Sequence, residues 1–265
     1  MPLVRVADVD LYYELHGPEG APVVAFVNGI FQDTTGWALH VRRLRDRFRC
    51  LVWDCRGQGR SAKPPGPYAT TRHAADLGAL LDTLAVARAH VVGSSNGAAV
   101  AMHFAASHPD RVAALVLAAP FARADAALRA KLASWRAALD AGGPALRYDV
   151  AVPWNWSARF LAEHAADVAA LREVAAGLDP DAQRSLLDGS MAHDAAAALS
   201  RITAPTLVLV GEHDLLTPPW MARAVAAGIA GARLDVLSET GHALAIERVD
   251  DFCVLVATFV GAPHS

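Results

Sequence analysis

The sequence has few cysteines: Cys50, Cys55 and Cys253 are the only three in 265 residues. Three cysteines cannot form a complete set of disulfides, and their spacing is not that of a metal site. Unpaired thiols are typical of a reducing compartment. We therefore expect a cytoplasmic protein with no metal site.

Long hydrophobic runs and an excess of one charge sign are also missing. No apolar run approaches the ~20 residues that a membrane span requires, and no basic segment followed by an apolar core suggests a signal peptide. The 24 basic and 27 acidic residues give a formal charge of −3, whereas a nucleic-acid-binding protein needs a basic face. We expect neither a membrane nor a nucleic-acid partner.

The residues that are present suit a folded α/β domain. Hydrophobic residues make up 54% of the chain, which is ample for a core. Strand-like runs alternate with helical patterns, which predicts a largely parallel sheet covered by helices on both faces. The first two runs predict an antiparallel hairpin at the sheet edge. The predicted strands lie near residues 3–6, 9–15, 22–27, 48–54, 89–94, 112–118, 205–211 and 232–237.

One of these runs leads into Gly93-Ser94-Ser95-Asn96-Gly97, a Gly-x-Ser-x-Gly motif followed by a helix of small residues. The glycines permit a sharp strand-to-helix turn that holds Ser95 in a strained, exposed position. The helix N-terminus would supply positive charge to an oxyanion formed on attack. The motif predicts Ser95 as a nucleophile, provided that the chain also supplies a base and an acid.

Both partners follow later strand-like runs. Asp214 comes after the run 205–211, and His242 comes after the run 232–237. A neutral imidazole with a pKa near ~6.5 can remove the serine proton, and a fixed carboxylate orients the imidazole and stabilises its charged form. We therefore expect Ser95, His242 and Asp214 to act together. His213 adjoins the acid, but its side chain is expected to point away from the site.

With the order Ser, Asp, His after successive strands, the chain resembles the α/β-hydrolase superfamily over nearly its whole length. The resemblance implies that fold, no cofactor, and an oxyanion hole made by the backbone N–H groups of Ile30 and Asn96. The superfamily usually has His-Gly where this chain has Asn28-Gly29. In this respect the chain looks most like the esterase and 3-oxoadipate enol-lactonase branch. Asn28 could equally replace one loop-bracing residue by another.

The segment 121–201 interrupts the alternation of strands and helices because it is Ala-rich and helical in pattern. The resemblance implies a helical lid there, with residues 1–120 and 202–265 forming the core domain. Lid tryptophans could line an apolar pocket or pack one lid helix on another. Residues flanking the motifs are further candidates for the pocket wall. The predicted pocket residues are Phe31, Gln32, Trp135, Trp154, Trp156 and Leu215.

These features predict a cofactor-independent serine hydrolase that forms an acyl-enzyme on a small-to-medium apolar ester, lactone or thioester. A carrier protein is a possible partner, since the same machinery serves carrier-bound thioesterases and cyclases. Hydrolysis of a C–C bond also stays open. A ligand receptor of the same fold, without turnover, is the alternative from another class, because one fold hosts many functions.

Overall fold

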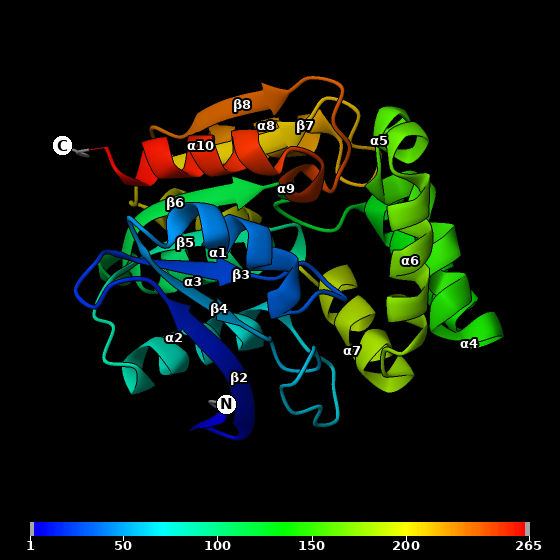
Figure 1. The fold of residues 1–265 in the computed structure, drawn as a ribbon, viewed down its shortest axis with the longest axis horizontal. Helices are drawn as coiled ribbons and strands as arrows, with labels where there is room; N and C mark the ends of the chain where they lie inside the picture. The colour runs from blue at the N-terminus through cyan, green and yellow to red at the C-terminus, as the bar shows by residue number, and fades with distance from the viewer. Residues whose placement is uncertain (1–2, 263–265) are drawn as a thin grey trace.

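The computed structural model describes residues 3–262. Its central feature is a single twisted sheet of eight strands. The strands follow the order β1-β2-β4-β3-β5-β6-β7-β8, and the pairs β1–β2 and β2–β4 are antiparallel while all others are parallel (Figure 1). Each strand begins and ends within one residue of its predicted bounds, and the predicted edge hairpin is confirmed. The strands are β1 (Leu3–Val6), β2 (Val9–His16), β3 (Val23–Val27), β4 (Arg49–Trp53), β5 (Ala89–Ser94), β6 (Val112–Ala118), β7 (Thr206–Gly211) and β8 (Arg233–Leu237).

Helices cover both faces of the sheet, as the alternating pattern predicts (Figure 1). The helices α2, α3 and α8 pack on one face, and α1 and α10 pack together on the other. The core helices are α1 (Ala38–Leu44), α2 (Thr70–Thr83), α3 (Asn96–Ser107), α8 (Pro219–Gly228), α9 (Leu244–Glu247) and α10 (Val249–Val260). Three short 3-10 turns are η1 (Thr34–Trp37), η2 (Pro109–Arg111) and η3 (Ala196–Arg201).

The core lies in two layers because successive side chains of a strand point to opposite faces. In β3, Val24 and Phe26 belong to the layer under α1 and α10, whereas Ala25 and Val27 belong to the layer under α2 and α3. The central strands are buried on both faces and are mostly apolar, as parallel strands between two helical layers usually are. This rigid frame fixes the loops at the carboxyl ends of the strands.

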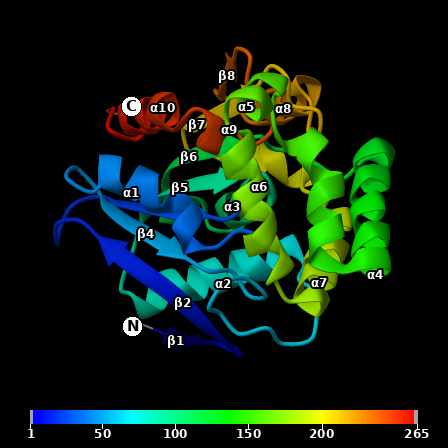
Figure 2. The ribbon, with the colours of Figure 1, turned by 45° about the vertical axis from the view of Figure 1, so that its right-hand side comes forward.

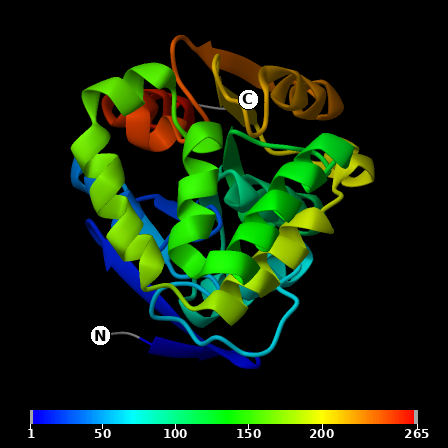
Figure 3. The same cartoon turned by 90° about the vertical axis from the view of Figure 1, so that its right-hand side faces the viewer.

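Between β6 and β7 the chain forms a group of helices that lies beside the sheet (Figure 2) and stands in front of it in the view of Figure 3. Glycines interrupt the first of these helices: Gly142 and Gly143 leave helical geometry and divide it into two arms. Asp125 and Asp179 cap two of these helices by accepting hydrogen bonds from backbone N–H groups. The helices are α4 (Ala126–Asn155), α5 (Ala158–Glu163), α6 (Ala165–Ala176) and α7 (Pro180–Met191).

A short antiparallel contact closes the base of this helical insertion. Arg123 and Asp194 form an isolated β-bridge, and the N–H of Ala124 donates to the carbonyl of His193 at 3.0 Å. The buried His193 imidazole lies 3.0 Å from Thr70 Oγ1 on α2, which attaches the insertion to the core. Burial lowers the pKa of His193 to about 4, so the imidazole is neutral near pH 7.

The described residues bear on two expectations drawn from the composition. All three cysteines are buried and unpaired. No helix within residues 3–262 combines the length and the hydropathy needed to cross a membrane.

Candidate active site

The turn from β5 to α3 holds Ser95 in a strained backbone conformation, with φ 55° and ψ −117°. A non-glycine residue adopts positive φ only where its surroundings enforce it. Here the surroundings are tight, since an added Cβ at Gly97 would lie 2.1 Å from the carbonyl oxygen of Val27, and one at Gly93 would lie 2.3 Å from the carbonyl of Gly97. The two glycines therefore allow β3, β5 and α3 to meet at the point where Ser95 projects.

The structure brings the predicted acid and base to Ser95. His242 Nε2 lies 2.8 Å from Ser95 Oγ, and His242 Nδ1 lies 2.8 Å from Asp214 Oδ2. The three residues follow β5, β8 and β7, so parallel strands deliver them to the same edge of the sheet. Asp214 is 2% exposed and His242 is 7% exposed. This hydrogen-bonded chain could carry a proton from the hydroxyl to the imidazole while the carboxylate holds the ring.

Thr217 joins this hydrogen-bonded chain, although the sequence motifs did not indicate it. Its hydroxyl lies 3.0 Å from Asp214 Oδ2, 3.0 Å from His242 Nδ1 and 3.1 Å from the carbonyl oxygen of Ala119. The other carboxylate oxygen of Asp214 accepts hydrogen bonds from the N–H groups of Leu216 and Thr217. The position of a threonine three residues after the acid is the sequence signal that could have revealed this role.

The loop after β3 is braced by side chains. The amide of Asn28 donates to the carbonyl of Trp53 at 3.1 Å and accepts from Trp37 Nε1 at 2.7 Å. The N–H of Gly29 donates to Gln32 Oε1 at 3.0 Å, and Gln58 Nε2 donates to the carbonyl of Gly29 at 2.7 Å. The Asn28 side chain therefore braces the loop in this structure. Its contacts fit the loop-bracing role, one of the two interpretations drawn from the sequence.

The two predicted oxyanion-hole residues belong to the loop after β3 and to the start of α3. Ile30 follows the braced loop, and Asn96 is the first residue of α3. The Asn96 side chain accepts a hydrogen bond from Ser190 Oγ of α7 at 2.8 Å, which joins the helical insertion to the N-terminus of α3. Backbone N–H groups at a helix N-terminus favour negative charge.

The predicted pocket residues have different environments. Phe31 lies with its ring centre 6.4 Å from that of the buried Trp135, at the junction of core and insertion. Trp154 is half-buried, with Lys131 Nζ 5.0 Å from the centre of its ring. Trp156 stacks on Phe160 of α5 at 4.8 Å between ring centres, so it packs one helix on another. The pocket assignment of Trp156 has no support from these contacts.

Gln32 and Leu215 also differ from a simple pocket wall. The side-chain oxygen of Gln32 accepts the hydrogen bond from the N–H of Gly29 described above. Gln32 also borders a small cavity beside Trp37 and Ser94. Leu215 is 55% exposed. Its backbone carbonyl accepts a hydrogen bond from Lys131, whose pKa is lowered by burial against the opposing influence of Asp214. Leu215 therefore faces solvent rather than a closed pocket.

Glu247 ties the histidine loop to the helical insertion. One carboxylate oxygen accepts from the N–H of Ser157 at 2.8 Å, and the other accepts from Ser157 Oγ at 2.7 Å and from the N–H of Gly241 at 3.1 Å. Gly241 precedes His242, so the carboxylate fixes the loop on which the imidazole sits.

Within residues 3–262, no group of three or more histidine, cysteine, aspartate or glutamate side chains is placed to hold a metal ion.

Known proteins resemble this chain over nearly its whole length. A model of the alpha/beta hydrolase fold family matches residues 22–249. The candidate carbamate hydrolase RutD of Azorhizobium caulinodans is 30% identical, with 98% of each chain covered. MGS-M2, an alpha/beta hydrolase enzyme from a Medee basin deep-sea metagenome library, is 28% identical with a TM-score of 0.94, covering 100% of this chain and 98% of its own. The enol-lactonase from Burkholderia xenovorans LB400 is 30% identical with a TM-score of 0.90, covering 98% of this chain and 100% of its own.

The chain therefore belongs to the α/β-hydrolase fold family, as its motifs predict. The order of strands and the presence of an enol-lactonase among its structural neighbours confirm the fold and the resemblance stated from the sequence. Because these relatives are named hydrolases, the expectation of an enzyme of the hydrolase class is also confirmed.

Proposed function

We propose that this protein is a cofactor-independent serine hydrolase that cleaves a small-to-medium ester, lactone or related acyl bond through an acyl-enzyme. The observation that carries the proposal is the hydrogen-bonded chain from Ser95 through His242 to Asp214, with Ser95 strained at the tip of the turn. The names of the enol-lactonase and carbamate hydrolase relatives support an acyl substrate with an oxygen or nitrogen leaving group.

The contacts suggest a role for each group. Ser95 Oγ attacks the carbonyl carbon while His242 Nε2 takes its proton, and Asp214 stabilises the resulting imidazolium. The backbone N–H groups of Ile30 and Asn96 receive the negative charge on the carbonyl oxygen. His242 then gives the proton to the leaving group, and a water molecule, deprotonated by His242, releases the acid from Ser95.

The helical insertion, residues 121–201, is proposed to act as the lid of this site. Its contacts to the catalytic loops support this role: Ser190 binds the Asn96 side chain, and Ser157 binds Glu247 beside the histidine loop. A lid anchored at these points would exclude water from the reacting atoms and select the substrate.

A fluorophosphonate probe tests the nucleophile without knowledge of the substrate. We expect one adduct by intact mass on the wild type and on Ser134→Ala, a control at an exposed serine of α4, and none on Ser95→Ala. Equal labelling of Ser95→Ala would refute the proposal. If the wild type itself forms no adduct, Ser95 is not activated, and a ligand receptor of the same fold becomes the better explanation.

A further inference from the structure

A buried cation lies where the helical insertion meets the core. Arg147, on the second arm of α4, is only 3% exposed. Its Nε donates to Gln183 Oε1 of α7 at 2.8 Å, and its guanidinium carbon lies 4.1 Å from the centre of the Phe31 ring. The side chain is thus held by one neutral hydrogen bond and one aromatic face, without a compensating charge.

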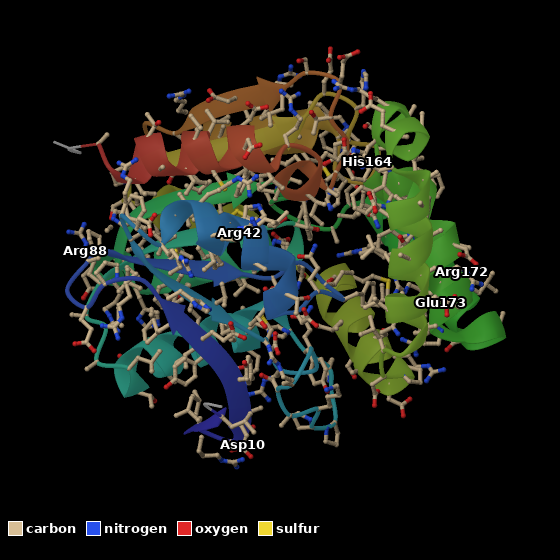
Figure 4. The ribbon with its side chains drawn as sticks, in the orientation of Figure 1. Asp10, Arg42, Arg88, His164, Arg172 and Glu173 are labelled. Atoms are coloured by element: carbon tan, nitrogen blue, oxygen red, sulfur yellow. The ribbon has the colours of Figure 1, made fainter. Side chains whose placement is uncertain are left out.

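Among the described residues no carboxylate forms an ion pair with this guanidinium, the only charge-bearing neighbour that influences its pKa is Tyr148, and its buried Nη2 has no hydrogen-bond partner. Two other arginines of the insertion show the usual ion pairing: Arg136 reaches Asp188 at 2.7 Å, and Arg172 reaches Asp149 at 2.8 Å. Arg172 and its neighbour Glu173 lie on the outer side of α6, away from the sheet (Figure 4).

Burying an unpaired charge is costly, so an unpaired buried arginine calls for an anion that completes it. Burial lowers the pKa of Arg147 to about 10, which leaves the side chain protonated at neutral pH. Attraction to a bound negative group would offset the cost of removing this charge from water.

The position of Arg147 relates it to the candidate active site. The ring beneath the guanidinium belongs to Phe31, which directly follows Ile30, the proposed oxyanion-hole residue. Trp135 packs on the same ring. A substrate between insertion and core could therefore reach the oxyanion hole with one end and the guanidinium with the other. Planar guanidinium donors fit a carboxylate with two parallel hydrogen bonds.

We propose that Arg147 binds a free carboxylate of the substrate, so that the preferred substrates are acyl compounds carrying a second, acidic group. This inference rests on the proposed hydrolase function, because it places the carboxylate on the molecule that Ser95 attacks. It makes Arg147 a specificity residue, and it replaces the expectation of a wholly apolar acyl pocket.

Two esters of equal chain length test the proposal: mono-4-nitrophenyl adipate, which ends in a carboxylate, and 4-nitrophenyl hexanoate, which ends in a methyl group. We expect the ratio of kcat/KM for adipate over hexanoate to fall about 10- to 100-fold in Arg147→Met, because a charge-assisted hydrogen bond is lost. Arg147→Lys keeps the positive charge but lacks the planar guanidinium, so we expect its kcat/KM ratio to lie between those of the wild type and Arg147→Met. The control Arg136→Met, at the paired arginine of the same helix, keeps the wild-type ratio.

An unchanged ratio in both Arg147 variants, or a wild type that prefers hexanoate tenfold or more, would overturn the proposal. Binding of monomethyl adipate and methyl hexanoate to Ser95→Ala, measured by calorimetry, separates this inference from the proposed function. Tighter binding of the adipate, weakened at least tenfold by adding Arg147→Met, supports the carboxylate site even if Ser95 proves not to be the nucleophile. Equal binding of both ligands overturns it even if Ser95 is confirmed.

Discussion

The close contact between α3 and β3 predicts that Gly97→Ala will damage the site more than its small size suggests. The new Cβ would lie 2.1 Å from the carbonyl oxygen of Val27 and 2.7 Å from that of Asn28, whereas real Cβ contacts stay above 3.0 Å. Both oxygens belong to backbone, so they cannot rotate away. The start of α3 must move by the difference between 3.0 and 2.1 Å, about 0.9 Å, away from the loop that carries Ile30.

Such a shift separates the two proposed oxyanion donors. Overpacking of this kind costs about 1–3 kcal/mol of stability, and a misplacement of about 1 Å at reacting groups can lower the rate about 10²-fold. We therefore expect kcat/KM on a 4-nitrophenyl ester to fall about 100-fold, with the free energy of unfolding lowered by about 1–3 kcal/mol.

The assay compares Gly97→Ala with Gly36→Ala, where an added Cβ meets no atom within 4 Å. Steady-state kinetics are measured well below the unfolding temperature, and urea unfolding gives the stability of each variant. If Gly97→Ala retains kcat/KM within threefold of Gly36→Ala, the reasoning from backbone contact to catalysis is refuted.

Two further predictions concern Thr217 and the buried His73. Thr217→Val keeps the shape of the side chain but removes the hydroxyl that contacts Asp214 and His242. Because a hydrogen bond to a carboxylate is worth about 1.5–3 kcal/mol, kcat/KM should fall about 10- to 100-fold. Full activity would contradict this. Burial lowers the pKa of His73 to about 3. Below about pH 6.5 the unfolded chain therefore binds a proton at this histidine that the folded chain does not bind. The free energy of unfolding falls as the pH falls, by up to about 1.4 kcal/mol per pH unit. Urea unfolding from pH 7 to 4 should therefore show a flatter profile for His73→Leu, and identical profiles would contradict the buried neutral state.

The sequence determined the frame of the molecule and the identity of its central residues. Apolar runs bounded by turn residues placed the central strands, because burial on both faces of a parallel sheet favours continuous apolar strands. The Gly-x-Ser-x-Gly turn and the order of Ser95, Asp214 and His242 indicated the family, because a tight turn and a strand end each leave a local signature. The interruption at 142–143 also followed from local residue preferences, since glycine breaks a helix.

Only the tertiary structure decided which side chains meet across the chain. Thr217 is near Asp214 in sequence, but its contacts to Ala119 and His242 depend on the packing of separate strands. The stacking of Trp156 and the burial of Arg147 between helices likewise depend on how the insertion folds onto itself and the core. A local pattern records the preference of a residue for a strand, helix or turn, whereas these roles arise from contacts between distant segments that no local pattern specifies.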